Sequence, residues 1–234
     1  MQLPGGIRFA AAALIVAGVT ALAVPVHADD AMDARQLVER AKLSFEGMIV
    51  APEMDGLRDL IRRAKGVFIA PQVLRGAFIF GVSGGSGVFF ARSELPGQWK
   101  GPAFYTIGEA SFGFQAGADA SEVALLAMTD RGVNALLSTS VKLGADASVA
   151  AGPVGVGVRA ATANISADIV SFSRSKGLYG GVSVDGAVVA TRGALNAAYY
   201  GKDVSTQDIL IRGTASNPQA APLVALIKKA AEAP

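Results

Sequence analysis

The chain has 234 residues, with 21 lysines and arginines, 19 aspartates and glutamates, one histidine and no cysteine. Its balanced charge lacks the recurring basic blocks with which nucleic-acid-binding proteins neutralise many phosphates, so we exclude nucleic acid as a partner. Without cysteine the chain forms no disulfide and offers no thiolate to zinc, and we expect neither a metal nor a cofactor.

Residues 1–28 have the features of a secretory signal peptide. Arg8 supplies a positive charge, residues 9–24 form an apolar core, and Val26-His27-Ala28 is a small-x-Ala cleavage site. Cleavage after Ala28 would remove the only histidine. We therefore expect a periplasmic or secreted protein in which residues 29–234 form a single domain.

The N-terminal part of the expected mature chain predicts two helices. Apolar residues at helical spacing indicate an amphipathic helix over residues 31–47. A second helix is expected to begin at Pro52 and to run to about Ala64.

The middle of the chain predicts a series of strands. The first is expected to stop at Pro71, because proline cannot donate a hydrogen bond to a sheet ladder. The glycine-rich segment 83–87 is expected to be the turn of a hairpin. The expected strands cover residues 67–70, 75–82, 88–92, 103–116, 123–128, 149–160, 169–174, 178–184 and 187–190.

Four more helices are expected, one among the strands and three at the C-terminal end. Thr129 is placed to cap the first of them, and Ser205 with Asp208 has the spacing of a capping box. These helices cover residues 130–137, 192–200, 205–213 and 223–231. The order of elements predicts an α+β fold, a twisted antiparallel β-sheet or barrel-like sandwich packed by N- and C-terminal helices.

One pentapeptide, Gly-Ala-Asp-Ala-Ser, occurs twice, at residues 117–121 and 144–148. We expect two similar turns, in each of which the aspartate accepts hydrogen bonds from the backbone.

Two short motifs match those of serine nucleophiles, but neither has the surroundings that such a nucleophile needs. Residues 81–85 match G-x-S-x-G, yet a strand follows them and no histidine remains after cleavage. Ser173 and Lys176 match S-x-x-K, but they lie on an expected strand, where an odd spacing sends two side chains to opposite faces. We therefore predict no catalytic residue and no enzyme.

Carboxylate catalysis is the enzymatic alternative that the sequence leaves open. Glu109 lies in an apolar strand on the face of Tyr105 and Ile107. A glycan hydrolase of the cell envelope would pair it with a second carboxylate, for which Asp119 and Glu122 are candidates. A purely structural glutamate is the other interpretation, since the sequence fixes no distance between such groups.

A basic stripe at the end of the second helix is the main candidate for binding. The stripe consists of Arg58, Arg62, Arg63 and Lys65. On a solvated helix face, Asp55 and Asp59 would pair with the three arginines at spacings of three and four residues. On a binding surface, each cation would contribute about 1 kcal/mol toward anionic headgroups. The residues alone favour the solvated face over the binding surface.

Several longer segments resemble SYLF domains, a lipid-binding module that is also known as an actin-binding domain in fungal members. The similar segments are Ala64–Arg75, Pro102–Tyr105, Gly113–Gly117, Leu143–Gly155, Ser171–Tyr179 and Tyr199–Lys202. The resemblance covers roughly residues 35 to 230. It implies a non-enzymatic module that binds membrane lipid, phosphoinositides in eukaryotic members, through basic residues and an amphipathic N-terminal segment.

The resemblance also selects the cations of the expected lipid site. They are Lys65, Arg75, Arg174 and Lys176 by motif, with Arg62 and Arg63 adjoining them. Because the leader predicts export, we expect anionic phospholipid or a membrane surface as the partner rather than actin. A structural envelope protein without a specific ligand is the remaining alternative.

Overall fold

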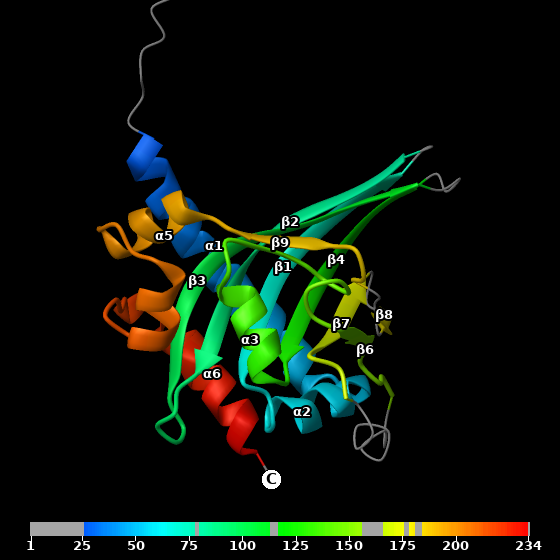
Figure 1. Cartoon of the computed structure of the whole chain (residues 1–234). Helices are drawn as coiled ribbons and strands as arrows, with labels where there is room; N and C mark the ends of the chain where they lie inside the picture. Colours follow the sequence, from blue (N-terminus) through cyan, green and yellow to red (C-terminus); the bar gives the residue numbers. More distant parts are fainter. Residues whose placement is uncertain are drawn as a thin grey trace, which may run out of the picture.

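The structure, a computed structural model, describes residues 26–77, 80–112, 117–155, 166–175, 178–180 and 184–233. Most of the predicted signal peptide, residues 1–25, therefore lies outside the described residues. The described chain folds into one twisted and curled β-sheet with helices on both of its faces (Figure 1). This arrangement confirms the predicted α+β fold.

Nine strands of the described residues form the sheet. They are β1 (Gly66–Ala77), β2 (Phe80–Arg92), β3 (Trp99–Phe112), β4 (Gly117–Ala127), β5 (Ser140–Lys142), β6 (Val149–Ala151), β7 (Ile169–Ser175), β8 (Leu178–Gly180) and β9 (Val188–Thr191). Their order is β5-β9-β3-β2-β1-β4-β7-β6, and β8 pairs with β7. The pairings are antiparallel, as predicted, except that β6 runs parallel to β7.

Strand β1 continues past Pro71, so the prediction that Pro71 ends it is wrong. The register of β1 shifts between Ile69 and Gln72 against β2, and between Ala70 and Val73 against β4. The ladder thus skips Pro71, which has no N–H to donate, and the strand resumes beyond this bulge.

The glycine-rich segment 83–87 lies inside β2, so the hairpin predicted there is also wrong. Two of its glycines, Gly85 and Gly87, are needed where neighbouring strands come close. A Cβ at Gly85 would lie 2.2 Å from the backbone oxygen of Gln72, and one at Gly87 would lie 2.4 Å from the ring of Phe68. No helix follows the G-x-S-x-G match at residues 81–85, which excludes a nucleophile elbow there.

The helices lie where they were predicted, but most of them differ in length from the predicted helices. The predicted helix 31–47 is longer in the structure, and the predicted helix from Pro52 to Ala64 is divided at Met54, whose side chain is fully buried. Thr129 and the Ser205–Asp208 pair form caps as predicted, because Gly132 donates to Thr129 and the pair exchanges backbone-to-side-chain hydrogen bonds. The helical elements are α1 (Val26–Val50), η1 (Pro52–Met54), α2 (Asp55–Ile61), α3 (Asp130–Leu137), α5 (Gly193–Tyr200), the π-helix η2 (Asp208–Arg212), η3 (Pro218–Ala220) and α6 (Ala221–Glu232).

Four of the predicted strands include residues outside the described ones: residues 78–79 of the strand predicted for 75–82, residues 113–116 of the strand predicted for 103–116, and parts of the strands predicted for 149–160 and 178–184. The strand predicted for residues 149–160 begins as β6, and residues 156–160 lie outside the described residues. The strand predicted for 178–184 begins as β8, and residues 181–183 lie outside them.

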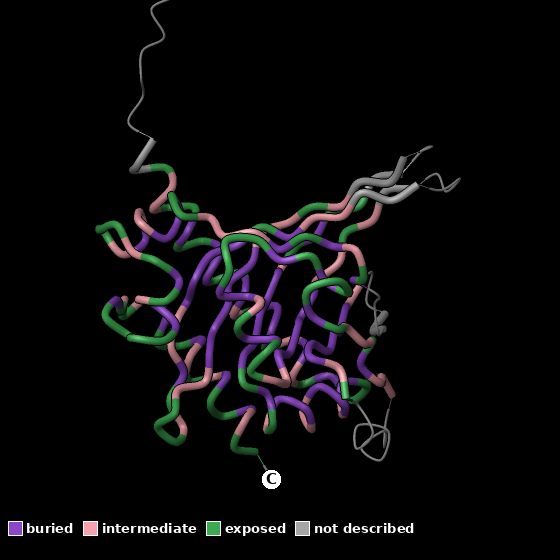
Figure 2. Tube along the Cα trace, in the orientation of Figure 1, coloured by how far each residue is buried: buried purple, intermediate pink, exposed green. Residues whose placement is uncertain are grey.

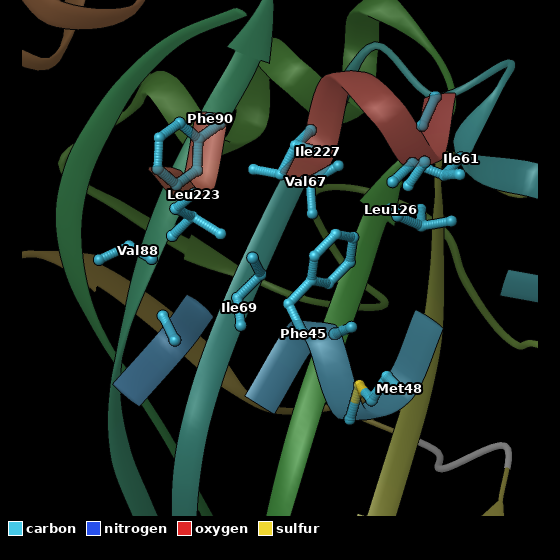
Figure 3. Close-up of a cluster of buried hydrophobic side chains, with 14 of the residues drawn as sticks. Phe45, Met48, Ile61, Val67, Ile69, Val88, Phe90, Leu126, Leu223 and Ile227 are labelled. Atoms are coloured by element: carbon cyan, nitrogen blue, oxygen red, sulfur yellow. The ribbon is translucent and has the colours of Figure 1, made fainter. Parts of the chain in front are cut away.

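The sheet separates two hydrophobic cores, because alternate residues of each strand point to opposite faces. In β1, Val67 and Ile69 face the core formed with α1, α2, α5 and α6, while Phe68 faces the core formed with α3 and η2. Figure 3 shows the first core, in which Phe45 and Met48 of α1 pack over the sheet. The buried residues concentrate in the centre of the molecule, whereas the ends of β1 to β4 project beyond it (Figures 1 and 2).

Candidate functional site

The three adjacent cations predicted at the end of α2 each lie beside a carboxylate. Arg62 and Arg63 share Asp59, at 2.5 and 3.2 Å between nitrogen and oxygen, and Lys65 contacts Asp130 of α3 at 2.6 Å. The side chains of Arg63 and Lys65 are about half exposed. The structure therefore brings these three together at one end of the molecule and partly neutralises them.

Helix α6 adds two lysines to the same end. Arg62 Nη1 approaches the backbone oxygen of Ala233 at 3.5 Å, which joins the end of α2 to the end of α6 (Figure 1). Lys228 and Lys229 are exposed on this last part of α6, and Lys228 lies 3.9 Å from Glu232.

We call the resulting group the basal cluster. It contains five cations, beside which lie three carboxylates. The two lysines could not be assigned to this group from the sequence, because no sequence signal places α6 beside α2. The cations of the basal cluster are Arg62, Arg63, Lys65, Lys228 and Lys229, and the neighbouring carboxylates are Asp59, Asp130 and Glu232.

Two of the other predicted cations lie away from the basal cluster. Arg75 follows Lys65 by ten residues along β1, a separation of about 30 Å at about 3.3 Å per residue. It lies 4.0 Å from Glu109, on the face of the sheet that α3 and η2 cover. Arg174 pairs with Glu122 at 2.6 Å on the opposite face, beside Gly47 of α1, and both side chains are about a quarter exposed. Lys176 lies outside the described residues.

The structure does not place the three carboxylates considered for glycan hydrolysis next to one another. Glu109 and Asp119 occupy the ends of one row across β3, β2, β1 and β4, in which Arg75 lies between them. Three strand spacings of about 4.8 Å separate their backbones by about 14 Å. Asp119 accepts hydrogen bonds from Ser175, and Glu122 lies on the other face.

One buried carboxylate, Asp168, serves the fold. It accepts hydrogen bonds from the hydroxyl of Thr129 at 2.6 Å and from the backbone N–H and the hydroxyl of Ser148 at 3.0 and 2.8 Å. These donors hold the pKa of Asp168 below its usual range. Asp168 thereby ties the cap of α3 to the segment that precedes β6.

Two further features bear on function. Within the described residues, no group of three or more acidic or imidazole side chains is placed to hold a metal ion. None of the described helices combines the length and the apolar character that a membrane crossing requires.

Comparison with known proteins identifies relatives over most of the chain. Protein YSC84 of Saccharomyces cerevisiae is 32% identical over 177 residues, which cover 74% of this chain and 37% of the relative. SH3 domain-containing YSC84-like protein 1 of Homo sapiens is 32% identical over 171 residues, 72% of this chain and 49% of the relative. LAS seventeen-binding protein 3 of S. cerevisiae is 31% identical over 177 residues, 74% and 38% of the two chains.

The chain thus spans less than half the length of these relatives, all of which carry the names of binding or Ysc84-like proteins. The family model described as "Ysc84: Las17-binding protein actin regulator" matches residues 108–230. Together these matches confirm the predicted SYLF resemblance, and the chain belongs to the Ysc84 (SYLF) family.

Proposed function

We propose that this chain is an exported, non-enzymatic protein that binds anionic phospholipid through the basal cluster. The observation that carries the proposal is the gathering of five cations from α2, the start of β1 and α6 at one end of the molecule. At about 1 kcal/mol for each cation near an anionic membrane, such a group supports reversible binding.

The ion pairs within the basal cluster are compatible with this function. Exposed ion pairs stabilise a protein by about 0 to 1 kcal/mol, so little free energy is lost when a lipid phosphate replaces a carboxylate. Asp59 also serves two arginines at once, so Arg62 and Arg63 share one carboxylate.

Binding rather than catalysis is favoured by the relatives and by the site. The family description names Las17 binding and actin regulation. An exported chain would not meet actin, and we therefore assign the binding role to the membrane surface. Arg75 and Arg174 lie away from the basal cluster, and the proposal does not depend on them.

The proposal is tested by co-sedimentation of the purified protein with vesicles. We expect pelleting with vesicles that contain phosphatidylglycerol, a loss of pelleting in high salt, and little pelleting with pure phosphatidylcholine. Changing Arg62, Arg63 and Lys65 together to Glu should weaken the pelleting with anionic vesicles by about tenfold or more.

The matched control reverses three exposed cations outside the basal cluster, Arg35, Lys142 and Lys202, and changes the net charge equally. Circular dichroism checks that both triple variants are folded. Equal loss of binding in the two variants would show a general charge effect, and unchanged binding in the first variant would remove the basal cluster from the function.

A further inference from the structure

Two further arginines, Arg40 and Arg192, form no ion pair with any of the described residues. Arg40 is exposed on α1, and Arg192 precedes α5. Arg192 Nη1 donates to the hydroxyl of Ser86 in β2 at 2.9 Å. They differ in this from the cations of the basal cluster, three of which lie against Asp59 or Asp130.

Both arginines border a small hollow between α1 and the adjoining surface of β1 and β2. Its volume is about 160 Å³. Arg40 lines it directly, and Arg192 reaches it through Ser86. The residues that line the hollow are Leu37, Arg40, Pro71, Gln72, Leu74, Gly84, Gly85 and Ser86.

The lining of the hollow is partly apolar. Leu74 is 56% exposed although it is a large aliphatic side chain. Its cross-strand neighbours in the sheet are Gly84 on β2 and Ala120 on β4.

Gly84 differs from the glycine that follows it. No atom lies within 4 Å of a Cβ built on Gly84, whereas a Cβ on Gly85 would collide with the backbone of Gln72. The packing of this chain therefore does not require a glycine at position 84. A glycine inside a strand often marks a place where a ligand or another backbone approaches closely.

Charge and size together define what the hollow accepts. The two charged side chains at its border are both cationic, which favours carboxylates or phosphates. A volume of about 160 Å³ lies below the roughly 300 to 1,000 Å³ of small-molecule sites, so the hollow takes single side chains rather than a whole lipid.

We propose that this hollow docks an extended, acidic segment of a protein partner, in which carboxylates pair with Arg40 and Arg192 and an apolar side chain covers Leu74. In an extended peptide, alternate side chains share a face. The fitting pattern is therefore acidic, x, apolar, x, acidic. This role is separate from lipid binding, because none of the lining residues belongs to the basal cluster.

The test uses fluorescence anisotropy with the purified full chain and the labelled peptide Gly-Asp-Ser-Leu-Ser-Asp-Gly. A second peptide of the same composition, Gly-Ser-Asp-Leu-Asp-Ser-Gly, turns the carboxylates away from the leucine. A third peptide has lysine in place of aspartate. We expect the first peptide to bind at least about tenfold more tightly than either of the others.

Two protein variants locate the binding. Arg40→Glu with Arg192→Glu should weaken binding of the first peptide by about tenfold or more, because the charge of the site is reversed. Gly84→Leu should fill the hollow, since a Cβ at this position meets no atom within 4 Å, while Ala145→Leu, an exposed change outside the hollow, should leave binding unchanged.

The variant with Glu at positions 62, 63 and 65 separates the two proposals. It should keep full peptide binding, so failure of lipid binding and failure of peptide docking are distinguishable. Equal binding of all three peptides would overturn the docking site. Unchanged affinity for the first peptide in both hollow variants would overturn it as well. Displacement of the first peptide by phosphatidylglycerol vesicles, or Arg40-dependent dimerisation measured by light scattering, would assign the hollow to lipid or to a second copy and would also overturn it.

Discussion

Asp168 shows how a single polar side chain can determine local structure without taking part in a chemical reaction. Its oxygens accept three hydrogen bonds from Thr129 and Ser148, so the cap of α3 and the entry to β6 share one anchor. A buried carboxylate with these partners stabilises the fold only while it is ionised, because the donors favour its charged form.

The folded protein should therefore lose stability in acid through Asp168. Its pKa is lower in the folded than in the unfolded state, so its contribution is present above the ordinary aspartate pKa of about 4 and is lost as the pH falls through the folded pKa. Asp168→Asn should lower the free energy of unfolding at pH 7 by about 1 to 3 kcal/mol. Urea unfolding from pH 7 to pH 3 measures this, and the difference from the unchanged protein should shrink below about pH 4.

The exposed Asp203 provides the control for that titration. Asp203→Asn should follow the unchanged protein at every pH. A difference between Asp168→Asn and the unchanged protein that is constant from pH 7 to pH 3 would contradict the assigned role.

The repeated pentapeptide shows where local sequence does not predict the structure of individual residues. The two Gly-Ala-Asp-Ala-Ser copies were both expected to be turns, but residues 117–121 lie in β4, and only residues 144–148 make a turn, with Gly144 at φ 85°. Asp119 accepts from Ser175, whereas Asp146 accepts from the backbone of Lys142. The same five residues adopt two structures because the strands β1 and β7 pair with the first copy, which local sequence does not encode.

At the scale of the element, Arg174 connects strands β7 and β4 with α1. Its pair with Glu122 lies on the face that α1 covers, and a Cβ on Gly47 would come within 2.7 Å of the Arg174 guanidinium. Removing Arg174 leaves a partly buried carboxylate beneath a helix. This placement indicates a structural role in addition to any contact with lipid.

We therefore expect Arg174→Met to reduce stability. The free energy of unfolding should fall by about 1 to 3 kcal/mol, because Glu122 loses its charged partner, and Glu122→Gln in the same protein should restore part of the loss. Chemical denaturation of both variants measures the effect. Unchanged vesicle pelleting at a temperature where Arg174→Met remains folded supports the structural role, and a selective loss of pelleting in a fully stable variant would argue against it.

The elements that could be predicted are those whose ends carry local signals. Thr129 and the Ser205–Asp208 pair are side-chain caps, so the starts of α3 and the helical segment near η2 followed from spacing alone. Pro71 and the glycines of β2 gave misleading signals, because a bulge and the close approach of β1 to β2 accommodate them. The basal cluster was predicted only in the part that is contiguous in sequence, and its α6 lysines and the α1–β2 hollow depend on tertiary packing.

One sheet supports both hydrophobic cores of the molecule. We therefore expect the two cores to unfold together. Leu125 and Leu126 are adjacent on β4 and fully buried, yet they belong to opposite cores. Leu125→Ala and Leu126→Ala should each lower the free energy of unfolding by about 2 to 5 kcal/mol. In both variants the thermal transition should remain single, with far-ultraviolet circular dichroism and Trp99 fluorescence changing together. Separate transitions for the two probes in either variant would show that the cores are independent.

The strand order β3-β2-β1-β4 also has a consequence for biogenesis. The hairpin of β1 and β2 is synthesised first but lies in the centre of the finished sheet, flanked by strands that are made later. Until residue 127 has left the ribosome, at least one long edge of the nascent hairpin has no neighbour to pair with. The stretch between Arg75 and Arg92 contains no charged residue that would discourage association of two such edges. This hairpin is thus the segment for which a holding chaperone would have the greatest value.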